Sequence, residues 1–171
     1  MDSIDKFFTS RSSRKTPKKA PKIIPATGDI KRHSGGSPWR HTKTGYREDL
    51  EIVLRSGWEA NVARVLKAYN IVYEFEPIAF SYPLKRGTRS YTPDFRLTKT
   101  EEWIEVKGYF DDKSRIKLKR FKLYYPEEFE KLTLIIGGAK KAITICESLE
   151  VPFLFYSDIA KRYKGIISNW E

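Results

Sequence analysis

The chain is predicted to fold as an α/β protein with a mixed central sheet flanked by helices. Apolar residues recur at helical spacing between Leu54 and Tyr69, and again between Ala139 and Leu149. Alternating strand-like runs lie between these two segments. The short apolar run Leu132–Ile136 is typical of a strand buried on both faces. A helix between the early strands and this buried strand implies that helices cover both faces of the sheet.

The individual elements follow in order from Asp49, where we expect the globular domain, residues 49–171, to begin. The first helix carries Leu54, Trp58, Val62, Val65, Leu66 and Tyr69 on one stripe. The expected strands are about Val72–Pro77, Ile78–Tyr82, Tyr91–Leu97, Trp103–Lys107, Leu132–Ile136 and Phe153–Tyr156. Lys85–Arg89 is predicted to form a turn around Gly87. A basic helix is expected at Lys113–Tyr125, and a helical segment is expected to end the chain.

Residues 1–48 form a basic segment that is expected to be mostly disordered. The segment is rich in Ser, Thr, Pro, Gly, Lys and Arg and poor in large aliphatic residues. Residues 1–47 contain twelve Lys or Arg against three Asp, so nine of the eleven net positive charges of the chain lie there. Such a segment is attracted to a polyanion. Nucleic acid is the expected partner, with an anionic membrane as the alternative.

Composition excludes several other classes of protein. The sequence has no apolar run of about 18 residues and no apolar signal-peptide segment, so we expect an intracellular protein that is neither secreted nor membrane-spanning. Cys146 is the single cysteine and cannot form an intrachain disulfide. It is expected to be a packed small hydrophobe. His33 and His41 lie in the basic segment, and too few Cys and His exist for a structural zinc site.

A short apolar motif stands out near the N-terminus. Ile4, Phe7 and Phe8 have the i, i+3, i+4 spacing of a one-turn apolar plug. The stretch 3–8 resembles sliding-clamp-binding peptides, although Met1 stands where those peptides carry Gln. The alternative is an amphipathic turn that packs on its own domain.

The residues best suited to chemistry lie on two neighbouring predicted strands. Asp94 follows Pro93, and ten residues later Glu105 begins the tripeptide Glu-Val-Lys that ends at Lys107. Side chains two apart on a strand share a face, so Glu105 and Lys107 point the same way. If the strands pair, Asp94 and Glu105 can hold a Mg²⁺ or Mn²⁺ ion between them. Lys107 would then lie beside a metal-activated water; the alternative reading is ordinary exposed strand charges.

Glu59 is a third candidate ligand, from the first helix. Ser56 and Glu59 also fit a capping box, in which the glutamate returns to the backbone N–H of Ser56. Capping and catalysis both remain open from the pattern alone. Glu74 and Glu76 are weaker alternative ligands on the neighbouring strand.

A cluster of cations follows the candidate site. The expected helix carries Lys113, Arg115, Lys117, Lys119, Arg120 and Lys122. Arg86 and Arg89 lie in the turn before the site. Because the helix directly follows the strand of Glu105 and Lys107, these cations are expected to contact a nucleic-acid backbone; the alternative is a solvated basic face.

Several motifs together resemble the phage endonuclease I family of Holliday-junction resolvases, within the PD-(D/E)xK nuclease superfamily. They are RSGWE at Arg55–Glu59, YEFEP at Tyr73–Pro77, YTPDF at Tyr91–Phe95, EVKG at Glu105–Gly108 and ICESLEVPF at Ile145–Phe153. The resemblance implies a restriction-endonuclease-like fold with an αβββαβ core and two metal ions per site. It also implies that Glu59 joins Asp94, Glu105 and Lys107 in catalysis. A phage-encoded homodimer, with intertwined subunits that cut two strands at a branch point, is the implied assembly.

Two other functions stay open at this stage. The chain is more distantly similar to the transposon-end endonuclease TnsA, which would make it a sequence- or partner-directed nuclease. A DNA-binding or clamp-binding module without catalysis is the remaining alternative, and the intact Asp94, Glu105 and Lys107 argue against it.

Overall fold

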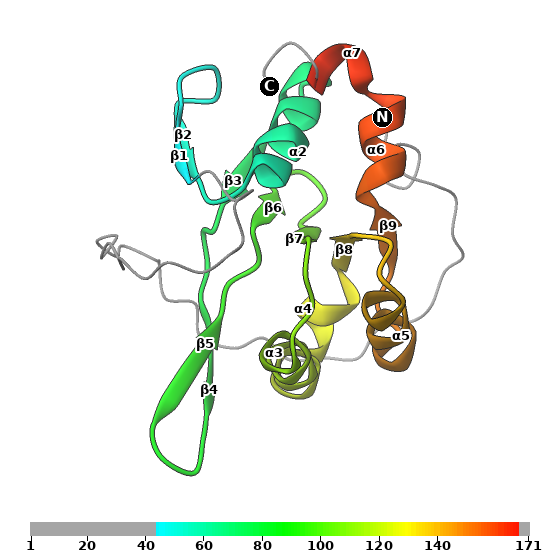
Figure 1. Ribbon diagram of the computed structural model, residues 1–171. Coiled ribbons are helices and arrows are strands. Elements are labelled where there is room, and N and C mark those ends of the chain that lie inside the picture. Colours follow the sequence, from blue (N-terminus) through cyan, green and yellow to red (C-terminus); the bar gives the residue numbers. More distant parts are fainter. Residues whose placement is uncertain (1–43, 168–171) are drawn as a thin grey trace.

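A five-stranded sheet lies between two groups of helices in the computed structural model, which describes residues 44–167 (Figure 1). The helices on one face are α2 (Gly57–Ala68), α6 (Tyr156–Arg162) and α7 (Lys164–Ile167). Those on the other face are α3 (Asp112–Tyr124), α4 (Pro126–Glu130) and α5 (Lys140–Leu149). None of these helices, all within residues 44–167, is long and apolar enough to cross a bilayer.

The sheet is mixed, as the sequence predicts. Its strand order is β3-β6-β7-β8-β9. The strands are β3 (Tyr73–Phe75), β6 (Phe95–Leu97), β7 (Trp103–Lys107), β8 (Leu132–Ile136) and β9 (Phe153–Phe155). The first three pair antiparallel, whereas β7, β8 and β9 pair parallel. The predicted strands at β7 and β8 are confirmed with the same bounds, because a central strand covered on both faces gives the clearest apolar pattern.

Two separate hairpins accompany the sheet. The first pairs β1 (Gly45–Arg47) with β2 (Ile52–Leu54), so regular structure begins a few residues before the expected boundary at Asp49. The second pairs β4 (Phe80–Pro83) with β5 (Thr88–Tyr91) and extends away from the body of the molecule (Figure 1). Its turn holds Gly87 at a φ of +84°, a conformation that glycine adopts without strain. Ile4, Phe7 and Phe8 lie outside the described residues.

Two boundary predictions are wrong. Tyr91–Leu97 is not one strand, because residues 92–94 leave the ladder between β5 and β6. Pro93 has no N–H to donate, and the Asp94 side chain takes a backbone N–H of β7 instead. Leu54 belongs to β2 and not to the first helix, because that helix begins only after its N-cap, Ser56.

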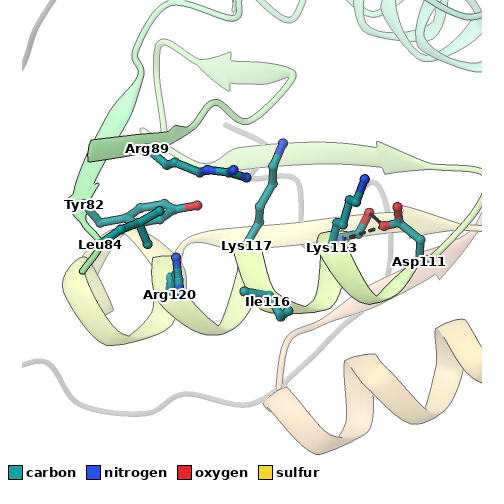
Figure 2. A pocket seen from close by; sticks show the side chains of 9 residues that line it. Tyr82, Leu84, Arg89, Asp111, Lys113, Ile116, Lys117 and Arg120 are labelled. Atoms are coloured by element: carbon teal, nitrogen blue, oxygen red, sulfur yellow. Dashed lines mark hydrogen bonds between the residues drawn. The ribbon is translucent and has the colours of Figure 1, made fainter. Parts of the chain in front are cut away.

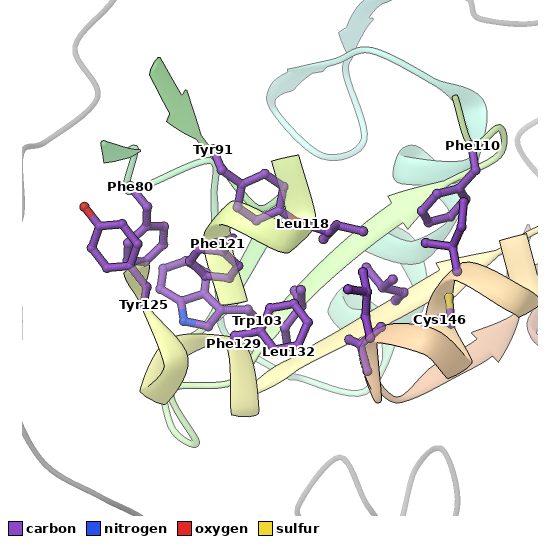
Figure 3. Close-up of a cluster of buried hydrophobic side chains, with 14 of the residues drawn as sticks. Phe80, Tyr91, Trp103, Phe110, Leu118, Phe121, Tyr125, Phe129, Leu132 and Cys146 are labelled. Carbon is purple, nitrogen blue, oxygen red and sulfur yellow. The ribbon is translucent and has the colours of Figure 1, made fainter. Parts of the chain in front are cut away.

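The core consists of two apolar clusters, one on each face of the sheet. Figure 3 shows the cluster under α3, α4 and α5, where Trp103, Phe121 and Phe129 pack together. The second cluster fills the space under α2, α6 and α7. Cys146 is fully buried in the first cluster, and burial raises the pKa of its thiol to about 11. The prediction that Cys146 packs as a small hydrophobe is therefore confirmed.

Candidate active site

Asp94 lies at the break between β5 and β6, with only 9% of its surface exposed. Its Oδ2 atom accepts a 2.6 Å hydrogen bond from the backbone N–H of Val106 in β7. Phe95 pairs with Ile104 in the β6–β7 ladder, so the residue before Phe95 stands across from the residue after Ile104. The register therefore sets Asp94 opposite Glu105.

Glu105 is a second buried carboxylate, in the middle of the central strand, and is 4% exposed. Its Oε1 atom accepts a 2.7 Å hydrogen bond from Nζ of Lys107. Its Oε2 atom is buried and has no hydrogen-bond partner among residues 44–167. Buried polar atoms nearly always have a partner, so this oxygen is suited to an additional ligand.

The two carboxylates repel each other, which is visible in the electrostatics of Asp94. Burial raises the pKa of Asp94 well above its ordinary value, and the charge on Glu105 adds to this shift. The N–H of Val106 lowers the pKa, Glu59 raises it and Lys107 lowers it, but these effects are smaller. A cation between the carboxylates would relieve the repulsion.

Lys107 carries the positive charge of the site and is about one-third exposed, at 30% of its side chain. Burial opposes its charged form, but Glu105, through its charge and hydrogen bond, together with Asp94 raises the pKa of Lys107 above its ordinary value. The ammonium group is therefore protonated at neutral pH. In this state it can supply a positive charge and a proton.

Tyr91 lies at the end of β5 and brings an unpartnered hydroxyl to the same region. The hydroxyl is buried and has no hydrogen-bond partner among the described residues. Burial raises the pKa of Tyr91 well above its usual value, and the charges of Glu105 and Asp94 raise it further. A hydrogen-bonding contribution from the Glu105 carboxylate also raises the pKa of Tyr91, so the hydroxyl lies near that carboxylate although the two groups do not meet strict hydrogen-bond geometry. Sequence alone does not distinguish Tyr91, because a tyrosine at a strand end is an ordinary core residue.

Glu59 takes part in capping helix α2, together with the N-cap residue Ser56. Its backbone N–H donates to Oγ of Ser56 at 3.2 Å, and the Ser56 hydroxyl donates to Oε1 of Glu59 at 2.8 Å. Its Oε2 atom accepts from the backbone N–H of Arg55 at 2.9 Å, and not from that of Ser56 as the capping-box pattern predicts. The side chain is buried, and its charge acts on both Asp94 and Glu76. Capping is confirmed, and the catalytic role of Glu59 stays a prediction.

Trp58 fixes the start of α2 against the end of the central strand. Its ring stacks on Tyr156 of α6, with centroids 4.0 Å apart. The same ring lies against Gly108, and a Cβ atom on Gly137 would approach it to 3.4 Å and the carbonyl of Gly108 to 3.3 Å. Gly137 therefore permits this close packing against the start of α2, the helix that carries Glu59.

Glu76 is the fourth carboxylate of the region, whereas Glu74 faces away. Burial raises the pKa of Glu76, Arg55 lowers it through a 2.7 Å ion pair, and Glu59 and Glu105 raise it. Glu74 is about half exposed and pairs with Arg96 at the surface. Residues two apart on a strand normally point to the same face, so alternation alone would place Glu74 and Glu76 together. Glu76 follows the end of β3 with a φ of +45°, and this departure from extended backbone separates the two side chains.

The carboxylates of the described residues fit a metal ion only in part. Within residues 44–167, no three Asp, Glu, His or Cys side chains are arranged to hold a metal ion. Asp94 and Glu105 converge, but the oxygens of Glu59 are engaged at the helix cap. The unpartnered Oε2 of Glu105 and the raised pKa of Asp94 nevertheless fit a hard divalent cation bound by oxygen.

The predicted DNA-binding cations separate into two sets in space. Arg89 of β5 lies across a cleft from Lys113, Lys117 and Arg120 of α3. The others lie elsewhere. Lys119 and Arg86 are exposed, Lys122 donates to the carbonyl of Leu149, and Arg115 lies 3.8 Å from Asp112.

A family comparison agrees with the motifs at the site. The model of the phage endonuclease I family matches residues 43–143, which is more than half of the chain. The chain belongs to the phage endonuclease I family. The matched range includes Glu59, Asp94, Glu105 and Lys107. Membership in this family supports nuclease activity.

Other comparisons add little. No curated protein matches the chain. Among solved structures, protein VC1899 from Vibrio cholerae matches with a TM-score of 0.40 and 10% sequence identity. The match covers 66% of this chain and 32% of VC1899, so the chain spans about a third of that protein's length.

Proposed function

We propose that this member of the phage endonuclease I family is a metal-dependent, structure-selective DNA endonuclease of the PD-(D/E)xK superfamily. In this proposal it hydrolyses phosphodiester bonds at Holliday junctions and other branched DNA. The observation that carries the proposal is the pairing of two buried carboxylates, Asp94 and Glu105, across β6 and β7, with Lys107 bonded to the second. A restriction-endonuclease-like core is the corresponding fold.

Asp94 and Glu105 would hold Mg²⁺ or Mn²⁺, and Glu59 is the proposed third ligand. The proposal includes two ions per active site. When bound, the metal polarises the scissile phosphate and makes a coordinated water more acidic. The protein supplies the rest. Val106 fixes the orientation of Asp94 through its N–H, and burial of both carboxylates keeps competing water away.

Lys107 has a separate role in this proposal. Its Nζ atom is protonated and bonded to Glu105, and its side chain is partly open to solvent. A phosphate that enters the site would therefore meet a fixed positive charge. This charge stabilises the additional negative charge that develops on the phosphate oxygens as the bond to the leaving group breaks.

We propose branched DNA as the substrate because of the family, and a homodimer because two cuts require two sites. Resolution of a four-way junction requires two cuts, and one chain carries one pair of site carboxylates. Two copies related by a twofold axis would place two sites on one junction. The net charge of +11 is consistent with a polyanionic substrate.

The test uses the full chain on three substrates of matched sequence: a four-way junction, a nicked duplex and a linear duplex. Cleavage is followed with Mg²⁺, with Mn²⁺ and with chelator. We expect paired, metal-dependent cuts near the branch of the junction. Asp94→Asn should abolish these cuts and leave junction binding, measured with chelator present, within about threefold, because phosphate contacts are made mostly by basic side chains.

Asp158→Asn provides a matched control, since the same chemical change is made on an exposed residue of α6. This variant should cut like the wild type. Equal cleavage of junction and linear duplex would refute structure selectivity. Cleavage that persists in Asp94→Asn would show that the site has been misplaced.

A further inference from the structure

A basic cleft lies between the β4–β5 hairpin and helix α3, with a volume of about 520 Å³. The hairpin contributes Tyr82, Leu84 and Arg89, and the helix contributes Lys113, Lys117 and Arg120. Figure 2 shows Arg89 extending from the hairpin over the helix, with Lys113 and Lys117 rising toward the same space. Cations from two elements that are separate in the sequence thus face one cavity.

The helical cations follow one side of α3. Lys113, Lys117 and Arg120 are at positions i, i+4 and i+7, which share a helix face. At 1.5 Å per residue, they span about 10 Å along the helix axis. Measured along the axis of a DNA duplex, one strand rises by about 3.4 Å per nucleotide, so the row corresponds to about three steps along that axis.

The charge of the cleft is strongly positive. Four cations face one carboxylate, Asp111, at the end of the cleft nearest the helix start. The charge of Asp111 is already engaged, because its Oδ1 accepts hydrogen bonds from the backbone N–H and hydroxyl of Ser114 at 2.7 and 2.6 Å. Lys113, Lys117 and Arg89 form no ion pair with any residue in 44–167, so their charges are not neutralised within the described chain.

The wall of the cleft orders one of its cations. The guanidinium of Arg120 lies 5.6 Å from the ring centroid of Tyr82, which is a cation–π contact. Tyr82 is itself buried and stacks on Tyr124, with an angle of 10° between the two ring planes. An arginine held in this way retains its fork of N–H donors for phosphate oxygens.

The cleft begins beside the candidate active site. Asp111 is close enough to Lys107 for each charge to affect the pKa of the other. From Asp111 the cleft runs along α3 toward Arg120. A strand whose phosphate lies at Lys107 would therefore continue directly into the cleft.

We propose that this cleft binds the sugar-phosphate backbone of the DNA strand on one side of the scissile phosphate, over about three nucleotides. The proposal rests on the proposed function and sharpens it. It assigns backbone binding to Lys113, Lys117, Arg120 and Arg89, and not to the basic helix as a whole. The hairpin and the helix together form the two walls of this subsite.

The test measures binding of the full chain to a fluorescent four-way junction with chelator present, so that binding does not depend on cleavage. Affinity is recorded over a range of salt concentrations. Lys117→Gln should reduce the slope of log affinity against log salt by about 0.9, and Lys113→Gln with Lys117→Gln by about twice this amount. Lys161→Gln on α6 makes the same change on an exposed residue far from the cleft and should not alter the slope.

Lys119 provides a control on the same helix, because it is exposed on α3 but does not line the cleft. Lys119→Gln should reduce the slope of log affinity against log salt by at most half as much as Lys117→Gln does. Equal losses for these two variants would overturn the cleft and favour a diffuse basic helix. An unchanged slope in Lys113→Gln with Lys117→Gln would overturn it as well, provided that thermal unfolding shows a folded protein.

Ethylation interference gives an independent measurement. Ethylated phosphates within about three nucleotides on one side of the cut should weaken binding of the wild type, because they remove the charge that the cations contact. The same phosphates should matter less for Lys113→Gln with Lys117→Gln. An identical interference pattern for both proteins would refute the subsite. Failure of cleavage with intact binding and interference would instead count against the proposed nuclease, leaving the cleft in place.

Discussion

Glu59 offers the sharpest test of the site, because the structure gives it two separable tasks. Its carboxylate caps α2 through Arg55 and Ser56, and its charge acts on Asp94. Glu59→Gln keeps an oxygen for the cap and removes the charge. Ser56→Ala does the opposite, since it removes two hydrogen bonds of the cap and leaves the Glu59 carboxylate on the N–H of Arg55.

Ser56→Ala is expected to lower the stability of the domain more than Glu59→Gln does. Ser56→Ala should cost about 1 kcal/mol of unfolding free energy, the usual loss for a helix N-cap. This corresponds to about 4 °C in Tm for a domain of this size. Glu59→Gln should change stability by less than about 1 kcal/mol, because the weakened hydrogen bond is offset by reduced repulsion with Asp94 and Glu76.

Activity should show the reverse order. If Glu59 is a metal ligand, Glu59→Gln should slow junction cleavage by at least about 100-fold, which equals about 2.7 kcal/mol of transition-state stabilisation. Ser56→Ala should slow it by less than about tenfold. The assay is single-turnover cleavage of a four-way junction at saturating Mg²⁺, with Tm measured by calorimetry on the same samples. Cleavage by Glu59→Gln within threefold of the wild type would show that Glu59 acts only as a cap.

Three further predictions concern the same domain. Mg²⁺ at 100 times its Kd should stabilise the wild type by about 2.7 kcal/mol and so raise its Tm, but should not raise the Tm of Glu105→Gln. Equal Tm shifts of the two proteins in calorimetry would place the ion elsewhere. Tyr91→Phe should leave the free energy of unfolding unchanged or raise it by up to about 1 kcal/mol, because the buried hydroxyl has no partner; a clear loss in urea denaturation would show that the hydroxyl is bonded in solution. The hydrogen bonds from Arg64 lower the pKa of Asp49 below its ordinary value of 3.8, so the pair stabilises the fold above about pH 4 and loses this effect as pH falls through the lowered pKa. Asp49→Asn should therefore cost about 2 kcal/mol at pH 7 and progressively less below pH 4, and an equal cost at pH 7 and pH 3 in urea denaturation would contradict the linkage.

The sequence by itself determined the class of fold and the core of the site. The run at β8 is apolar except for Thr133, and a short, mostly apolar run of this length is typical of a strand covered on both faces. Asp94, Glu105 and Lys107 could be singled out because strand alternation places Glu105 and Lys107 on one face, and Pro93 restricts the backbone that leads into Asp94.

Only the tertiary structure decided how the remaining groups are arranged. Glu76 and Glu74 follow the same alternating pattern, yet Glu76 turns into the site and Glu74 pairs with Arg96 at the surface. The ring of Tyr91 packs on the ring of Phe121, with centroids 4.7 Å apart, and this contact holds Tyr91 beside the site. No local sequence pattern encodes it.

The cleft is the clearest case of this division. The sequence places six cations on one helix, but helical periodicity alone does not say which side of α3 faces another element. Packing of α3 beside the β4–β5 hairpin selects Lys113, Lys117 and Arg120 and sets Arg89 opposite them. Sequence thus determines which charges exist along a helix, whereas contacts between elements distant in sequence determine which of those charges can act together.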